Sequence, residues 1–233
     1  MIYYIKNLIR QIYIFHNLYI KNKVYIEKKF YSQNKEDIFA LTFFKNKNNG
    51  FYVDVGCHHP TRINNTFLLY KHGWRGVNID MSKLSIDLFK ILRKEDINIH
   101  SAVSNKNKTI SYYTNKDLFL SASITQKKGN SKLKYKKKVS SKPLTDILDE
   151  TIYKKKQIDF LSIDAEGVDF EVLKSLDFKK YKPKLICIEI WEIWEKQIKE
   201  DEIKKHKIYK FLKKKKYKLI KNFAENFIFK KLN

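Results

Sequence analysis

The sequence predicts an α/β protein with a doubly wound, mostly parallel sheet that ends in an antiparallel hairpin. From Gly50 onward, short apolar runs alternate with segments of helical character, as in parallel strands joined by right-handed crossovers. The first run ends in a glycine turn, Phe51-Tyr-Val-Asp-Val-Gly56, of the kind at which open α/β sheets bind nucleotide-like ligands. The last two runs are joined by a short turn, which indicates a hairpin.

Each predicted strand is a mainly apolar run bounded by polar or turn residues. The runs cover residues 51–55, 77–80, 97–103, 158–163, 185–190, 217–221 and 226–230, with a short edge strand at 109–114. Helices are expected between them, with Gly73 ending the first and Pro143 opening the third. These helices cover residues 66–72, 84–92, 143–148, 169–176 and 203–213. A further helix begins near Ser32, which can cap a first turn that contains acidic residues.

A lysine-rich run covers residues 127–138 and includes Gly129 and Asn130. Such a run is typical of a solvated loop, and it also suits a lid over a binding site. The chain contains no internal repeat. We therefore expect one main domain, residues 31–233, preceded by an extension of different character, residues 1–30.

The extension is predicted to be an amphipathic helix. Its polar residues fall on one narrow stripe: Lys6, Arg10, Asn17 and Lys21. Its apolar residues lie broadly opposite: Ile5, Ile9, Ile12, Phe15 and Tyr19. We favour packing of this helix on the main domain or on a partner subunit. The alternative is peripheral contact with an anionic membrane, with the basic and aromatic sides at the interface.

The net charge of +24 points towards acidic partners such as nucleic acid, anionic glycan or a membrane surface. The richness in Lys, Ile and Asn also fits a general compositional bias, which we favour over a specific binding patch. Cys57 and Cys187 lie in apolar stretches and suggest no disulfide, so a reducing cytoplasmic location is expected. The uncharged stretch from Gln11 to Ile20 is too short to span a bilayer, and no signal-peptide cleavage site follows it.

Two acidic residues near strand ends are candidates for ligand binding. Asp80 follows the second strand, where a carboxylate can accept both ribose hydroxyls of an adenosine-containing cofactor, or can cap the next helix. Asp54 lies at the end of the first strand, where it can meet a cationic amine or stabilise the turn. The turn has one glycine and not the three that a dinucleotide pyrophosphate needs. This spacing favours a phosphate-free cofactor such as S-adenosylmethionine.

A second constellation, Ser162-Ile-Asp-Ala-Glu-Gly167, follows the fourth strand of the predicted parallel sheet. Asp164 and Glu166 alternate on an extended segment, so both can project into the crevice at the carboxyl edge of the sheet. Two carboxylates there suit base catalysis, a metal ion or orientation of an acceptor hydroxyl. Alternatively, Glu166 and Asp169 cap the following helix.

The ordered set of motifs resembles the FkbM family of S-adenosylmethionine-dependent methyltransferases. The matching stretches lie between residues 31 and 191: Ser32-Gln-Asn-Lys-Glu-Asp37, Gly50-Phe-Tyr-Val-Asp-Val-Gly56, Gly73-Trp-Arg-Gly-Val-Asn-Ile-Asp80, Ile158-Asp-Phe-Leu-Ser-Ile-Asp-Ala-Glu-Gly167, Glu171-Val-Leu-Lys-Ser175 and the strand after Pro183. The resemblance implies a class I methyltransferase (Rossmann-like) fold with a mostly parallel seven-stranded sheet. It also implies O-methylation of a hydroxyl on a sugar, polysaccharide or related metabolite.

Carried over by position, the resemblance assigns roles to individual residues. Asp54 and Gly56 would line the methionine end of the cofactor, and Asp80 would bind the ribose. Ser101 and Ala102 would lie near the adenine, and Asp164 and Glu166 beside the transferred methyl group.

The chain departs from many family members at Cys57-His-His-Pro60, where a small residue and an asparagine are common. Cys57 and His58 are expected at the cofactor turn. His59 is a candidate proton acceptor, although both histidines can instead cap the turn or pack beneath the cofactor. No spacing of His, Asp and Glu demands a metal ion.

Two other functional classes remain as alternatives. A nucleic-acid methyltransferase, for example one acting on RNA, would use the positive charge, but the Asn/Asp-Pro-Pro-aromatic motif of base-amine methylation is absent. A non-catalytic relative would keep the cofactor pocket without turnover. A glycosyltransferase is not favoured because the chain has no Asp-x-Asp motif. We therefore expect a glycan or small-molecule hydroxyl as the acceptor and no nucleic-acid partner.

Overall fold

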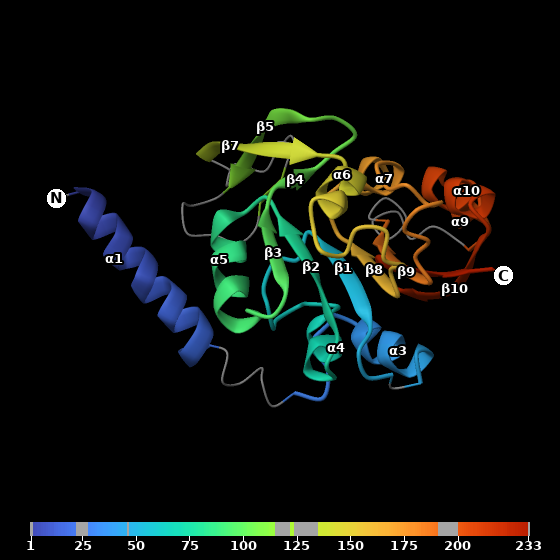
Figure 1. Cartoon of the computed structure of the whole chain (residues 1–233), viewed down its shortest axis with the longest axis horizontal. Coiled ribbons are helices and arrows are strands. Elements are labelled where there is room, and N and C mark those ends of the chain that lie inside the picture. Colours follow the sequence, from blue (N-terminus) through green and yellow to red (C-terminus); the bar gives the residue numbers. More distant parts are fainter. Residues whose placement is uncertain are drawn as a thin grey trace.

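The chain folds around a seven-stranded sheet with the order β10-β11-β9-β8-β1-β2-β3 (Figure 1). The computed structural model describes residues 2–21, 28–45, 47–114, 122–123, 135–190 and 200–232. The strands of this sheet are β1 (Phe51–Val55), β2 (Arg75–Asp80), β3 (Ile97–His100), β8 (Phe160–Ile163), β9 (Leu185–Glu189), β10 (Tyr217–Phe223) and β11 (Asn226–Lys231). Neighbours from β3 to β9 pair in parallel, whereas β11 pairs antiparallel with both β9 and β10. The mixed α/β fold, the mostly parallel sheet and the C-terminal hairpin are therefore confirmed.

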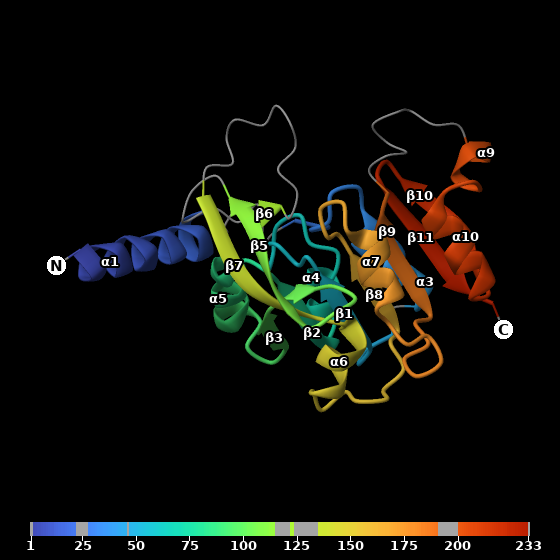
Figure 2. The same cartoon turned by 90° about the horizontal axis from the view of Figure 1, so that it is seen from above.

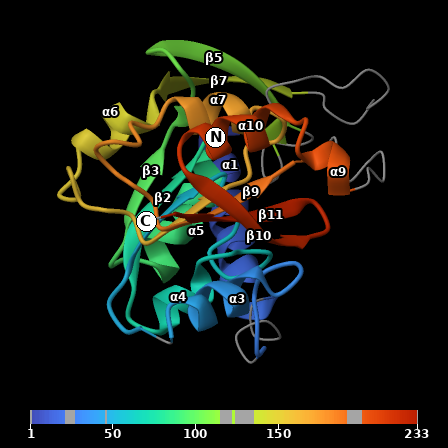
Figure 3. The same ribbon diagram turned by 90° about the vertical axis from the view of Figure 1, so that its right-hand side faces the viewer.

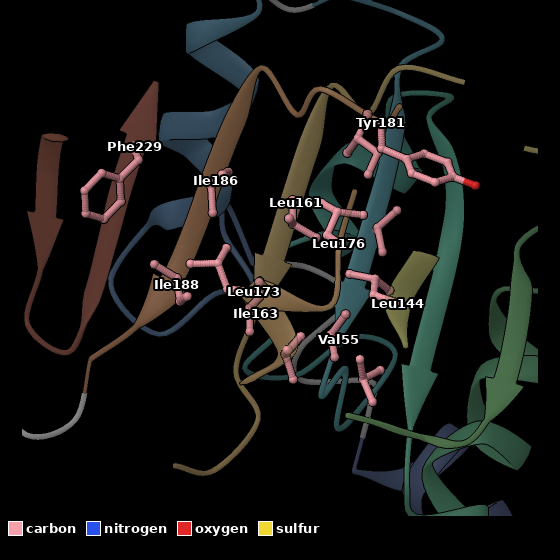
Figure 4. Packing of buried hydrophobic residues seen from close by; sticks show 14 of the residues in the cluster. Val55, Leu144, Leu161, Ile163, Leu173, Leu176, Tyr181, Ile186, Ile188 and Phe229 are labelled. Atoms are coloured by element: carbon pink, nitrogen blue, oxygen red, sulfur yellow. The ribbon is translucent and has the colours of Figure 1, made fainter. Parts of the chain in front are cut away.

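Helices cover both faces of this sheet, because its strands are apolar on both sides. The helices are α3 (Glu36–Phe43), α4 (Phe67–Lys71), α5 (Lys83–Leu92), α6 (Leu144–Asp149), α7 (Asp169–Lys174), α9 (Glu200–Ile203) and α10 (Lys207–Lys214). Phe51, Val53 and Val55 face one core, which α6, α7 and α10 cover. Figure 4 shows residues of this core, among them Val55, Leu144 of α6 and Leu173 of α7. Tyr52 faces the opposite core, which α3 and α4 cover (Figure 3). This alternation along β1 places Asp54 on the Tyr52 side of the sheet.

A second, four-stranded sheet lies beside the first and was not predicted. It has the order β4-β7-β5-β6. Its strands are β4 (Ala102–Val103), β5 (Lys108–Thr114), β6 (Ala122–Ser123) and β7 (Tyr135–Lys142). The predicted strand at 97–103 divides at Ser101 between the two sheets, and the predicted edge strand at 109–114 belongs to the second sheet.

The loop prediction for the lysine-rich run is wrong where the structure describes it. Residues 135–138 begin β7, whose residues 135–141 pair with β5. Val139 is buried with Tyr112 and Ala102, while its lysine neighbours Lys136 and Lys138 are exposed. A strand that buries so few side chains on one face lacks the alternation of apolar and polar residues from which strands are predicted. The remainder of the run, residues 127–134, lies outside the described residues.

The N-terminal extension contains α1 (Ile2–Phe15), which continues into a π-helical turn, η1 (His16–Ile20). Ile14 and Leu18 are buried against Leu84 and Leu88 of α5. The N-terminal half of α1 projects away from the domain (Figure 2). No helix in the described part of the chain combines the length and apolar character needed to cross a bilayer.

Candidate functional site

A cavity of about 250 Å³ lies at the carboxyl ends of β1, β2 and β8. The connection from β1 leads to β2 on one side, and β8 pairs on the other side, so this is the point at which the strand order reverses. The described lining residues come from the loops after these strands and from the start of the second sheet. They are Gln33, Val55, Gly56, His58, Ile63, Ile79, Asp80, Met81, Ser101, Ala102, Val103, Asp164, Ala165, Glu166, Val168, Glu189 and Glu225. The volume is close to the range typical of small-molecule sites, about 300–1,000 Å³.

Gly56 forms the turn after β1, and two observations explain why this position needs a glycine. Its φ is +77°, in the left-handed region that side chains disfavour. A Cβ atom at this position would also lie 1.7 Å from the carbonyl oxygen of Asp164. The turn after β1 and the loop after β8 therefore meet backbone to backbone.

Asp80 is held at the wall of the cavity by backbone amides. Its Oδ2 accepts a hydrogen bond from the amide of His58 at 2.9 Å, and its Oδ1 accepts one from the amide of Ser82 at 2.7 Å. Burial raises the pKa of Asp80 to about 6, while these hydrogen bonds act in the opposite direction. His58 itself has φ +54° and lines the cavity, and burial with the nearby Arg62 charge lowers its pKa to about 4.

Ser101 and Ala102 form the wall beyond Asp80. The amide of Ser101 donates to the carbonyl of Asp80 at 3.1 Å, and its hydroxyl donates to the carbonyl of Ser140 at 3.1 Å. Both residues are buried, and both line the cavity. This wall is therefore built from the junction between the two sheets.

Asp164 and Glu189 form a pair of carboxyl groups at the opposite end. Ile163 is paired with Ile188 in the β8–β9 register, so the next residues, Asp164 and Glu189, lie side by side. The two side chains share a hydrogen bond. Burial raises the pKa of both groups, that of Glu189 to about 8. The Glu189 charge raises the pKa of Asp164 further, whereas the hydrogen bond with Asp164 acts in the opposite direction on Glu189. A hydrogen bond between two carboxyl groups requires that the pair holds at least one proton.

The loop after Asp164 is shaped by Asp169, which accepts hydrogen bonds from the amides of Ala165 at 2.7 Å and Gly167 at 3.1 Å. Glu166 has φ +52°, an uncommon conformation for a residue with a side chain, and it is exposed at the cavity. Asp169 thus has a capping role in this loop, and Glu166 faces the space next to Asp164.

Asp54, unlike these residues, is absent from the described lining. It is buried and accepts hydrogen bonds from Thr66 Oγ1 at 2.7 Å and Asn64 Nδ2 at 3.1 Å. Both partners also receive hydrogen bonds from the guanidinium of Arg93, which is fully buried and paired with Asp96 at 2.9 Å. The structure therefore places Asp54 in a polar network beneath the turn.

Cys57 and His59 also lie behind the cavity wall. The thiol of Cys57 packs with Ile86 and Phe89, and burial raises its pKa. The ring of His59 is fully buried and contacts Arg62 through both the backbone amide and Nε. Burial and the Arg62 charge lower the pKa of His59 to about 2. His59 is consequently held neutral and away from the space in which a ligand would bind.

The described lining of the cavity is acidic, whereas the protein as a whole is strongly basic. Five carboxyl-bearing residues line the cavity, and none of its described lining residues is lysine or arginine, although the chain has 49 basic residues. Such a site attracts cations and repels phosphate. Within the described residues, no group of three or more His, Cys, Asp or Glu side chains is arranged to hold a metal ion.

The model of the FkbM methyltransferase domain matches residues 54–219 of the chain. The chain belongs to the FkbM methyltransferase family. The match begins at Asp54 and continues into β10, so it includes nearly every described residue of the cavity. No curated protein sequence matches the chain.

Several residues of this FkbM site were not predicted from the sequence. Glu189 ends β9, and its neighbour across the cavity, Glu225, lies in the turn of the hairpin. Gln33 donates a hydrogen bond to Glu225 at 2.7 Å and so connects the loop before α3 to the cavity. One indication of Glu189 was present in the sequence: it lies at the carboxyl end of a predicted parallel strand. Parallel sheets bind ligands at that end.

Proposed function

We propose that this FkbM protein is an S-adenosylmethionine-dependent O-methyltransferase with a class I fold. The observation that carries the proposal is the switch-point cavity, which combines the Gly56 turn with carboxylates and contains no described basic side chain. The parallel part of the sheet supports the class I assignment, because its order matches the first five strands of doubly wound folds.

The residues present fit this cofactor. Asp80 offers the remaining lone pairs of its carboxylate to ribose hydroxyls, and Ser101 and Ala102 offer a wall for the adenine. Gly56 lines the cavity without a side chain, and the Asp164–Glu189 pair, when ionised, places negative charge near the cationic end. When bound, S-adenosylmethionine supplies an electrophilic methyl group on a sulfonium centre.

The Asp164–Glu189 pair is the proposed proton acceptor for the acceptor hydroxyl. When the pair holds a single proton, an ionised carboxylate oxygen is able to accept the hydroxyl proton during methyl transfer. Glu166 and Glu225 stand next to the pair and would orient further hydroxyls by accepting their hydrogen bonds. This assignment moves the proton-acceptor role from His59, which the fold turns away from the cavity.

The same charges favour an uncharged, hydroxyl-rich acceptor. A sugar, a polysaccharide end or a related metabolite can donate several hydrogen bonds to carboxylates. A phosphate beside the reacting hydroxyl would face only negative charge in the described lining, which disfavours nucleic acid as the substrate. Acceptor class, cofactor and residue roles all belong to this proposal.

Purified protein incubated with isotope-labelled S-adenosylmethionine and fractionated cell-envelope glycans tests this function, with mass spectrometry of each fraction. We expect one methyl group per acceptor in a glycan fraction and none in an RNA fraction. Calorimetry on the same protein tests cofactor binding separately from methyl transfer. Binding of S-adenosylmethionine without methyl transfer to any fraction indicates a non-catalytic relative or a different acceptor. Absence of binding contradicts the methyl-donor assignment itself.

A further inference from the structure

The side of the N-terminal helix that faces away from the domain carries many exposed apolar residues. Seven large apolar residues of α1 and η1 have exposed fractions between 47% and 61%. We call them the N-terminal apolar face: Ile5, Leu8, Ile9, Ile12, Phe15, Tyr19 and Ile20. Their spacing of three or four residues places them on one side of the helix, and the rings of Phe15 and Tyr19 lie 5.0 Å apart. Soluble domains rarely expose an apolar surface of this kind without a partner.

The opposite side of the helix packs on the domain. This packing makes the apolar face point away from the domain. Ile14 and Leu18 pack on α5, and Arg10 forms an ion pair with Asp87 of the same helix. Asn17 Oδ1 accepts a hydrogen bond from Arg62 Nη2 at 2.7 Å. Arg10 and Asn17 of the polar stripe therefore face the protein, and the apolar face points outward along a helix that projects from the domain (Figure 1).

The charge around this face favours an anionic partner. Residues 1–26 contain four basic residues and no acidic one. The helix also adjoins α5, where Lys83 and Lys90 are exposed. A second copy of this +24 chain would bring like charges together at the contact, whereas an anionic surface would neutralise them.

We propose that the N-terminal apolar face inserts into the interface of an anionic lipid bilayer. Amphipathic helices with aromatic and aliphatic residues on one side and basic residues beside them bind lipid in this way. The helix would lie along the membrane plane, and Arg10, Ile14 and Asn17 would keep the methyltransferase domain attached to it. This proposal is independent of the methyl acceptor.

Binding of the full-length protein to vesicles tests the proposal. The vesicles contain phosphatidylglycerol and phosphatidylcholine, or phosphatidylcholine alone, and bound protein is measured by co-sedimentation. Ile9→Asn with Ile12→Asn removes the centre of the apolar face, and Ile152→Asn is the matched control because Ile152 is 85% exposed on a turn far along the chain. We expect the double variant to bind anionic vesicles about tenfold more weakly or worse, and the control to bind as the unchanged protein does.

Thermal unfolding of each variant separates folding defects from binding defects, and the double variant should keep its Tm since neither side chain joins the core. Repeating the measurement at about 0.5 M salt removes most attraction by the basic surface as a whole. Equal vesicle binding by the double variant and the unchanged protein would overturn the proposal. So would a dimer, detected by sedimentation velocity, that the double variant converts to a monomer.

Discussion

Asp80 illustrates how backbone geometry prepares one side chain for a ligand. Two amides fix its carboxylate at 2.7 and 2.9 Å, yet burial still raises its pKa to about 6. The group therefore changes charge within the range in which enzymes are commonly assayed. Its state at neutral pH is the ionised one, which suits hydrogen bonds from ribose.

The first prediction concerns the pH dependence of cofactor affinity. The ionised form of Asp80 is the better acceptor and the better partner for a cation, so affinity should rise with pH and level off above about 6. Below that value, the affinity should fall by up to about tenfold per pH unit. Asp80→Asn should lack this step, and Asp146→Asn, a change outside the described cavity lining, should keep it. Calorimetry across the pH range measures both, and a step that survives in Asp80→Asn would assign it to another group.

Glu189→Gln tests the proposed proton acceptor. We expect kcat to fall by about 10²–10³, with a smaller change in the affinity for S-adenosylmethionine. The pKa of Glu189 is raised above that of the unfolded chain, so its ionisation destabilises the fold increasingly as pH rises through the raised pKa. Glutamine removes this cost, and Tm above that pKa should increase by about 2–4 °C.

The combination of lower kcat and higher Tm is the distinguishing result. Glu171→Gln on α7, outside the described cavity lining, is the control and should alter neither quantity. Retention of full activity in Glu189→Gln would contradict the assignment. A loss of activity together with a loss of stability would indicate a structural role for the residue.

At the scale of elements, the turn after β1 and the loop after β8 act as one unit. Gly56→Ala should destabilise the protein by at least about 2 kcal/mol, because the new Cβ would meet the carbonyl of Asp164 in addition to the unfavourable φ. Gly167→Ala is the matched control: its φ is +91°, but no atom lies within 4 Å of the added Cβ. It should cost about 1–2 kcal/mol. Chemical denaturation gives both values, and equal losses would show that the backbone contact adds nothing.

The elements that could be predicted from the sequence are those with strong apolar runs. β1, β2, β8 and β9 are buried on both faces, so their runs were visible, and parallel pairing brought Gly56, Asp80 and Asp164 together. β7 was missed because its residues are mainly lysine and serine. Glu189 was missed because its position next to Asp164 depends on the β8–β9 register. The polar network of Asp54 was missed because a sequence does not reveal that a distant arginine, Arg93, is buried beside its partners.

At the scale of the molecule, the acidic cavity lies within a strongly basic protein. A cation such as S-adenosylmethionine is repelled at long range and attracted at short range. Added salt screens the long-range repulsion more than the short-range attraction, because the Debye length shortens to about 8 Å at physiological ionic strength.

Cofactor association should consequently accelerate with added salt. We expect the association rate constant to rise about two- to threefold between low and physiological ionic strength. S-adenosylhomocysteine lacks the sulfonium charge and is the control, with little dependence expected. Stopped-flow fluorescence measures both rates, and a rate for S-adenosylmethionine that falls with salt would show that the cavity's own charge dominates at long range.

The division of one predicted strand at Ser101 has a mechanical consequence. Ser101 bonds to Asp80 in the main sheet through its amide and to Ser140 in the second sheet through its hydroxyl. Ser101 therefore connects the two sheets, and the wall of the cavity that it forms with Ala102 is attached to both of them. If β7 moves relative to β2, this wall must move with it. The width of the cavity at Ser101 therefore depends on the angle between the two sheets.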